Sequence, residues 1–78
     1  MPVVLRLKGY RFEFFSLDVG EPPHVHVERD EKTAKIWIES LVVARNNGFS
    51  SRELMKVAAI VAEHQQEWLA RWRREFGR

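Results

Sequence analysis

The chain has 78 residues, which leaves room for one domain with a single small hydrophobic core. Hydrophobic residues make up 45% and charged residues 31%, a composition that excludes intrinsic disorder, and no stretch approaches the roughly 20 apolar residues of a membrane span. Cysteine is absent, which excludes disulfides and thiolate metal sites and leads us to expect a cytoplasmic protein. The net charge of +2 is too small by itself to indicate an acidic partner.

The first predicted element is a hairpin over residues 3–15, because apolar residues alternate on both sides of Lys8-Gly9. Folding about that pair gives these expected partners on the apolar face: Val3 and Phe14, Leu5 and Phe12, Leu7 and Tyr10. The other face pairs Val4 with Glu13 and Arg6 with Arg11. Two facing arginines lower stability unless an anion or a carboxylate bridges them.

A second hairpin follows the loop at residues 16–23, with strands at 24–29 and 33–39 joined by a turn on Asp30-Glu31. The expected apolar pairs are Val27 with Ala34 and Val25 with Ile36. The expected pairs on the opposite face are His26 with Lys35, His24 with Trp37, and Glu28 with Thr33. One face of this hairpin therefore presents two imidazoles, an ammonium and an indole.

The segment after this hairpin leads into a helix. Residues 40–45 fit either a short extra strand or a packed connector, and Asn46-Asn47-Gly48 is typical of a turn. Ser50 has the features of an N-cap, and Glu53 stands three residues later, as a capping box requires. We therefore expect a helix to begin at Ser50.

No proline or glycine interrupts this helix before Gly77, but it carries two apolar stripes. One stripe consists of Leu54, Val57, Ala58, Val61, Trp68 and Trp72, and the other of Met55, Ala59, Ala62, Leu69 and Phe76. Either the helix breaks near residues 63–66, or it stays continuous and its far end packs on a second copy of the chain. We favour the continuous helix and a homodimer, because the segment contains no helix breaker.

Residues 1–78 are thus expected to form one α+β domain: an antiparallel meander of four or five strands packed by one long C-terminal helix, or by two shorter ones.

His24 and His26 point to the same side of their strand with about 6.6 Å between their Cα atoms. With Glu28 they form an HxHxE pattern that a strand can present to a metal ion. Lys35, however, lies beside His26, and an ammonium raises the energy of a neighbouring cation. We therefore predict no metal and no cofactor, and keep a metal enzyme as the third hypothesis.

The same residues also fit general acid and base catalysis. One imidazole would deprotonate a hydroxyl nucleophile and the other would protonate the leaving oxygen of a phosphodiester. Lys35 would stabilise the charged transition state, so that His24, His26 and Lys35 are the candidate catalytic residues. A cofactor-free ribonuclease is therefore the second hypothesis. The plain alternative is that both histidines are ordinary half-exposed strand residues.

A non-enzymatic binding surface is the first hypothesis. Trp37 supplies a stacking ring, and Arg6 and Arg11 add cations if the first hairpin continues the sheet, a combination that suits single-stranded nucleic acid or an acidic protein. Arg71 and Arg74 near the C-terminus fit phosphate contacts equally well, although their plain role is to complement the helix dipole.

Several short motifs distributed along the chain resemble one known family. They are Gly9-Tyr10-Arg11-Phe12, Glu21-Pro22-Pro23-His24-Val25-His26-Val27, Ala34-Lys35 with Trp37, Ala44-Arg45-Asn46, and Gly48-Phe49-Ser50 with Glu53-Leu54. Together they resemble the bacterial family catalogued as domain of unknown function 4160.

The resemblance implies no established activity. It implies a small gene that stands beside another short gene in a toxin-antitoxin-like arrangement, and so a protein partner from the adjacent gene or an RNA or DNA target. The family pattern carries over to His24, His26, Lys35 and Trp37, the residues that the strand register places on one face.

Overall fold

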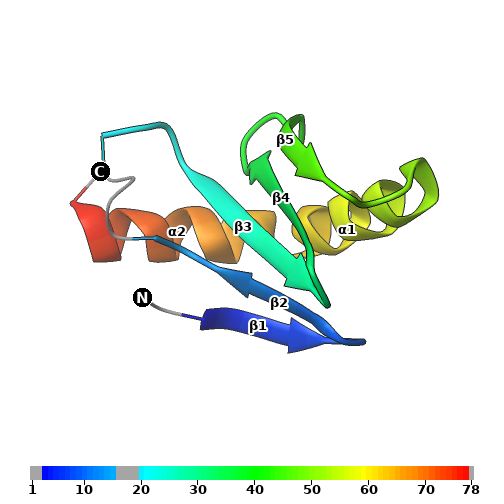
Figure 1. Ribbon diagram of the computed structural model, residues 1–78. Helices are drawn as coiled ribbons and strands as arrows, with labels where there is room; N and C mark the ends of the chain where they lie inside the picture. The colour runs from blue at the N-terminus through cyan, green and yellow to red at the C-terminus, as the bar shows by residue number, and fades with distance from the viewer. Residues whose placement is uncertain (1–2, 16–19, 78) are drawn as a thin grey trace.

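The computed structural model describes residues 3–15 and 20–77, which form one antiparallel sheet and two helices (Figure 1). The elements are β1 (Val3–Leu7), β2 (Tyr10–Glu13), β3 (His24–Arg29), β4 (Lys32–Trp37), β5 (Val43–Asn47), α1 (Ser51–Glu63) and α2 (Gln65–Phe76). The strands follow one another in the order β1-β2-β3-β4-β5, and both helices lie on the same side of the sheet (Figure 1). The predicted α+β meander with C-terminal helical packing is confirmed, with five strands.

The first hairpin turns on Lys8 and Gly9, whose φ angles of 53° and 85° are the left-handed values of a tight two-residue turn. The three predicted pairs nearest this turn are Leu5 with Phe12, Arg6 with Arg11 and Leu7 with Tyr10, and all are confirmed. The predicted pairing is wrong further from the turn, because Val3 pairs with Glu13 and not with Phe14. A register irregularity between Val3 and Leu5 displaces Val4 from its predicted partner, Glu13, since a bulge inserts one residue into one strand.

The second hairpin follows the predicted register throughout. The five predicted pairs between β3 and β4, from His24 with Trp37 to Glu28 with Thr33, are all present, and Asp30 and Glu31 form the turn. This hairpin stands at the centre of the sheet, because β3 pairs with β2 and β4 pairs with β5. The row of side chains that begins on β3 therefore continues onto neighbouring strands on both sides.

The fifth strand corrects the prediction of a turn at Asn46-Asn47-Gly48. Asn46 and Asn47 pair with Ala34 and Thr33 as the last residues of β5. The Asn46 side chain nevertheless shapes the exit from the strand, because its amide donates to the Phe49 carbonyl and its oxygen accepts from the Phe49 N–H. The turn residue thus acts through its side chain while its backbone stays in the sheet.

The predicted helix start is confirmed in detail. Ser50 is the N-cap, its hydroxyl accepts from the Glu53 N–H, and the Glu53 carboxylate accepts from the Ser50 N–H. This is the reciprocal arrangement of a capping box.

The helix breaks at His64, so the continuous helix was the wrong alternative. His64 Nδ1 lies 2.9 Å from the Ile60 carbonyl oxygen, and a side chain bonded to that carbonyl competes with the backbone ladder. Gln65 adds a tertiary anchor, because its amide donates to the Ile38 and Glu39 carbonyls at 2.8 and 3.0 Å. The break is made by polar side chains, without proline or glycine.

The core lies between the helices and the apolar face of the sheet. Aromatic contacts dominate it, with ring centroids 5.4 Å apart for Phe12 and Trp68 and 5.2 Å apart for Phe14 and Trp72. The buried apolar residues are Tyr10, Phe12, Phe14, Val25, Val27, Ala34, Ile36, Ile38, Phe49, Val57, Ile60, Val61, Trp68, Leu69 and Trp72.

The second apolar stripe of the predicted helix does not form one exposed surface, because the helix breaks at His64. Leu69 is buried in the core and Phe76 packs against it, whereas Met55 is 74% exposed. The homodimer stays a prediction, but Leu69 and Phe76, two members of the stripe on which it rests, pack within the chain. Among the described residues, neither helix is long and apolar enough to cross a membrane.

Candidate binding face

The side of the sheet that faces away from the helices is here called the polar face (Figure 1). His26 and Lys35 lie on it, because the residues that alternate with them, Val25, Val27, Ala34 and Ile36, are buried in the core. The central feature of the polar face is a row that crosses four strands. Glu13 on β2 pairs with His26 on β3, His26 pairs with Lys35 on β4, and Lys35 pairs with Arg45 on β5. Because directly paired residues point to the same face, a carboxylate, an imidazole, an ammonium and a guanidinium stand side by side.

His24 is buried, with 0% of its surface exposed, unlike the half-exposed residue of the plain alternative. Its Nδ1 lies 2.8 Å from the Pro22 carbonyl oxygen and therefore acts as a donor. Its ring contacts those of His26, Trp37 and Trp72, with centroids 5.2, 5.5 and 4.9 Å away. His24 therefore positions its neighbours and presents no surface to a ligand in this conformation.

His26 is the accessible histidine of the pair. It is partly exposed and stacks on Phe15, with ring centroids 3.9 Å apart and an interplanar angle of 13°. It lines a pocket of about 200 Å³ in the polar face. The lining residues are Glu13, Phe15, His26, Val27, Glu28, Thr33 and Arg45. Of the two predicted catalytic imidazoles, only that of His26 can meet a ligand there.

Lys35 lies beside His26 as predicted, but it is held by its own chain. Its ammonium forms an ion pair with Glu21, and its Nζ lies 4.8 Å from the centroid of the Trp37 ring. Only 12% of the Lys35 side chain is exposed. Lys35 and Trp37 therefore form a fixed edge of the polar face.

Arg6 and Arg11 do face each other, and carboxylates offset their repulsion. Arg11 hydrogen-bonds to Glu28 and forms an ion pair with Glu13 at 3.5 Å. Arg6 is exposed on β1. The sheet continues from β3 to this hairpin, so both arginines belong to the polar face as predicted.

Arg71 and Arg74 stand apart from the other predicted binding residues. Both lie on α2, in the helical layer on the opposite side of the sheet (Figure 1). Arg71 is partly buried and Arg74 is exposed. The structure thus does not bring the predicted set into one site.

Of the residues that line this pocket, only His26 belongs to the predicted site, and the sequence predicts no role for Glu13, Phe15, Thr33 or Arg45. The register of the first hairpin predicts Glu13 on the polar side, and Arg45 lies in the segment that fits either a strand or a connector. The strand alternation that placed His26 would also have placed Arg45, had the segment been assigned to a fifth strand.

Two residues of the HxHxE pattern, His24 and Glu28, are already engaged by other side chains. Glu28 is engaged by the Arg11 guanidinium, and His24 is buried among aromatic rings. Within residues 3–15 and 20–77, no three His, Asp or Glu side chains are grouped so that they could hold a metal ion.

Comparisons with known proteins give the family of the chain. No curated protein and no solved structure matches it. A family model described as "Domain of unknown function (DUF4160)" matches residues 9–73, which include the whole histidine hairpin, all of α1 and most of α2. The chain therefore belongs to the DUF4160 family.

Proposed function

We propose that the chain is an interaction module whose polar face binds a partner protein. The observation that supports this proposal is the charge pattern around the His26 pocket, where cationic and anionic groups surround a pair of stacked rings. Arg11 is paired with Glu13 and Glu28, Arg45 lines the pocket with both glutamates, and Phe15 stacks on His26. Protein interfaces use such mixed charges for specificity and a central pocket for an anchoring side chain.

The charge pattern favours a protein over a nucleic acid. Binding to nucleic acid depends on cations that neutralise phosphates. On the polar face, Arg11 is already paired with Glu13 and Glu28, and Lys35 with Glu21. A phosphate backbone would have to approach these carboxylates, whereas a protein can present charges of both signs.

The product of the adjacent short gene is the proposed partner. The family resemblance implies this gene pair, and the sheet offers a surface to which such a product can dock. Arg45 and Thr33 are exposed at the His26 pocket and are expected to touch the partner directly. His24 is expected to act indirectly, by holding the His26 and Trp37 rings in place.

Binding of the purified partner to Arg45→Glu and Thr33→Arg variants, measured by isothermal titration calorimetry, tests the proposal. Each variant is expected to weaken binding about tenfold or more, the range of a central interface residue. Arg52→Glu is the matched control, because it makes the same charge change at an exposed position on α1. Unchanged affinity of both polar-face variants would show that the partner binds elsewhere. Tight binding of single-stranded RNA that Arg45→Glu abolishes, without binding of the protein, would assign the face to nucleic acid.

A second candidate function, RNA cleavage without a metal, is favoured by one further observation. Glu13 and His26 are direct cross-strand partners and line the same pocket with Arg45. A carboxylate and an imidazole in that position fit the roles of general base and general acid, with the guanidinium stabilising the phosphorane-like charge. This candidate replaces the His24 and His26 pair by Glu13 and His26.

Incubation with RNA in the presence of EDTA tests the second candidate. Cleavage by the wild-type chain is expected to disappear in Glu13→Gln and His26→Ala variants and to persist in Arg52→Glu. Intact RNA with the wild-type chain would eliminate this candidate and leave the binding proposal untouched.

A further inference from the structure

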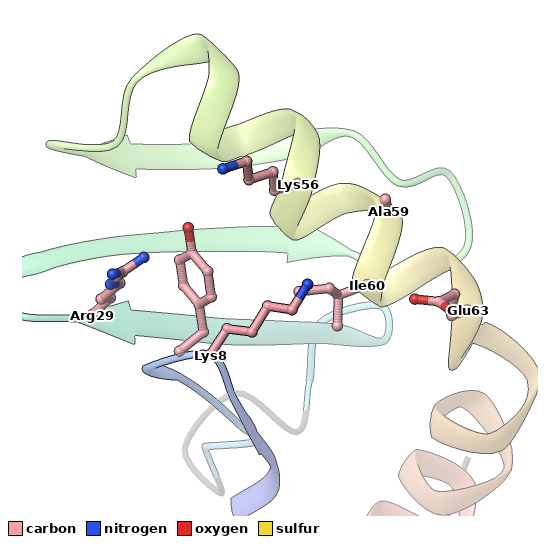
Figure 2. Close-up of a pocket in the computed structure, with 7 residues that line it drawn as sticks. Lys8, Arg29, Lys56, Ala59, Ile60 and Glu63 are labelled. Carbon is pink, nitrogen blue, oxygen red and sulfur yellow. The ribbon is translucent and has the colours of Figure 1, made fainter.

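A second pocket, of about 330 Å³, lies on the helical side of the sheet, away from the polar face (Figure 2). It forms where the β1–β2 turn and the last residue of β3 meet the C-terminal half of α1. The residues that line it are Lys8, Tyr10, Arg29, Lys56, Ala59, Ile60 and Glu63. Its volume falls at the lower end of the range of small-molecule sites, about 300–1,000 Å³.

Three cations from three different elements line this pocket. Lys8 comes from the β1–β2 turn, Arg29 from the end of β3 and Lys56 from α1 (Figure 2). In the part of the chain that the structure describes, no carboxylate oxygen lies within 4.0 Å of their charged nitrogens. This distinguishes the pocket from the polar face, where Arg11 and Lys35 are paired with glutamates.

The Arg29 guanidinium is held in place before any ligand arrives. Its Cζ lies 5.0 Å from the centroid of the buried Tyr10 ring, which favours a cation over its face. The backbone of Gly9 passes close to the same side chain, and a Cβ at that position would lie 3.3 Å from Arg29 Nε. A guanidinium fixed in this way loses little conformational freedom when it binds a planar or tetrahedral oxyanion.

Glu63 adds a carboxylate to this otherwise cationic and apolar pocket. It is the one carboxylate among the lining residues, and it stands on α1 beyond Ile60, away from Lys56 (Figure 2). A carboxylate accepts hydrogen bonds and repels anionic groups. It therefore suits a hydroxyl group of the ligand, and Ala59 and Ile60 lie between it and Lys56 along α1 (Figure 2).

We infer that this pocket binds a small sugar phosphate, with its phosphate held by Lys8, Arg29 and Lys56 and its hydroxyl groups by Glu63. Three cations and one carboxylate match the roughly two negative charges of a phosphate monoester at neutral pH. An Arg fork with two lysines is a usual arrangement for phosphate recognition. The site shares no lining residue with the polar face and so is independent of the proposed function.

Calorimetric titration of the full chain with ribose 5-phosphate, inorganic phosphate and ribose tests the inference. Ribose 5-phosphate is expected to bind more tightly than inorganic phosphate, and ribose is expected not to bind. Lys8→Met and Lys56→Met, which keep the length of the side chain and remove its charge, should each weaken binding of ribose 5-phosphate about tenfold or more. Arg52→Met, which removes a cation from an exposed position of α1 that lines neither pocket, is the matched control and should leave this affinity unchanged.

The Glu63→Gln variant tests the proposed hydroxyl contact separately from the proposed phosphate contact. Removal of its negative charge should tighten binding of inorganic phosphate, while the preference for ribose 5-phosphate over phosphate should shrink. An unchanged preference would overturn the role of Glu63 as a hydroxyl acceptor. No saturable binding of ribose 5-phosphate at millimolar concentration, or equal binding by the wild type and both lysine variants, would overturn the site.

Discussion

The imidazole of His24 packs against the indole of Trp72, with ring centroids 4.9 Å apart. This contact joins the first residue of β3 to the last turns of α2, although the two residues are far apart in the sequence. Both side chains are fully buried. His24 thus connects the helical layer to the polar face, where its ring also meets those of His26 and Trp37.

Because His24 is a packing residue, His24→Ala should destabilise the fold more than His26→Ala. Removal of a buried ring of this size is expected to lower the free energy of unfolding by about 2–4 kcal/mol. His26→Ala should cost about 1 kcal/mol, mainly through its stacking on Phe15. Urea denaturation followed by tryptophan fluorescence measures both changes. Equal losses, or a larger loss for His26→Ala, would contradict the structural role given to His24.

Gly48 connects β5 to the cap of α1 and should not tolerate a side chain. Its φ of 107° lies in the region that L-residues avoid, and a Cβ there would lie 2.8 Å from Lys32 Cγ. Gly48→Ala is therefore expected to lower the free energy of unfolding by about 1–3 kcal/mol. Gly20→Ala is the matched control, because a Cβ at Gly20 meets nothing within 4 Å. Thermal unfolding should show a clear fall in Tm for the first variant and little change for the second.

Glu53 should make the stability of the fold depend on pH in the acid range. A hydrogen bond from the Lys32 ammonium, followed by the bond from the Ser50 N–H, holds the pKa of Glu53 below its ordinary value of 4.5. A lowered pKa means that the folded state favours the charged carboxylate. Its contribution is present above pH 4.5 and is lost as the pH falls through the lowered pKa.

The measurement compares Glu53→Gln with the wild type by urea denaturation between pH 3 and pH 7. The variant should be less stable at pH 7, and the difference should shrink below pH 4.5. Glu75→Gln, at an exposed position on α2, controls for removal of a helix carboxylate. A difference that stays constant to pH 3 would show that the Lys32 bond does not favour the charged form of Glu53.

Gln65 should stabilise the break between the two helices. Its amide donates to the carbonyls of Ile38 and Glu39, which follow β4. Gln65→Ala removes both bonds and is expected to cost about 1–2 kcal/mol, whereas Gln66→Ala, at the exposed neighbouring position, should cost almost nothing. Amide hydrogen exchange should also show faster exchange of the Trp68 N–H, which donates to His64, in the first variant alone.

The central hairpin and the helix start were predictable because their signals are local. Alternation along 24–29 and 33–39 and a two-residue turn between them determine every pair from His24 with Trp37 to Glu28 with Thr33. Ser50 and Glu53 form the capping box within one helical turn. The bulge near Val3 was not predictable, because it depends on how the strand meets the rest of the sheet.

The sequence by itself determined which side chains share the polar face, since strand register follows from alternation and turn length. Only the tertiary structure decided that His24 is buried by Trp72 while His26 stays accessible, because that depends on where α2 crosses the sheet. It also decided the break at His64, where side-chain bonds outweigh helix propensity. The pocket between Lys8, Arg29 and Lys56 has the same origin, since distant segments meet there only when the helix packs on the sheet.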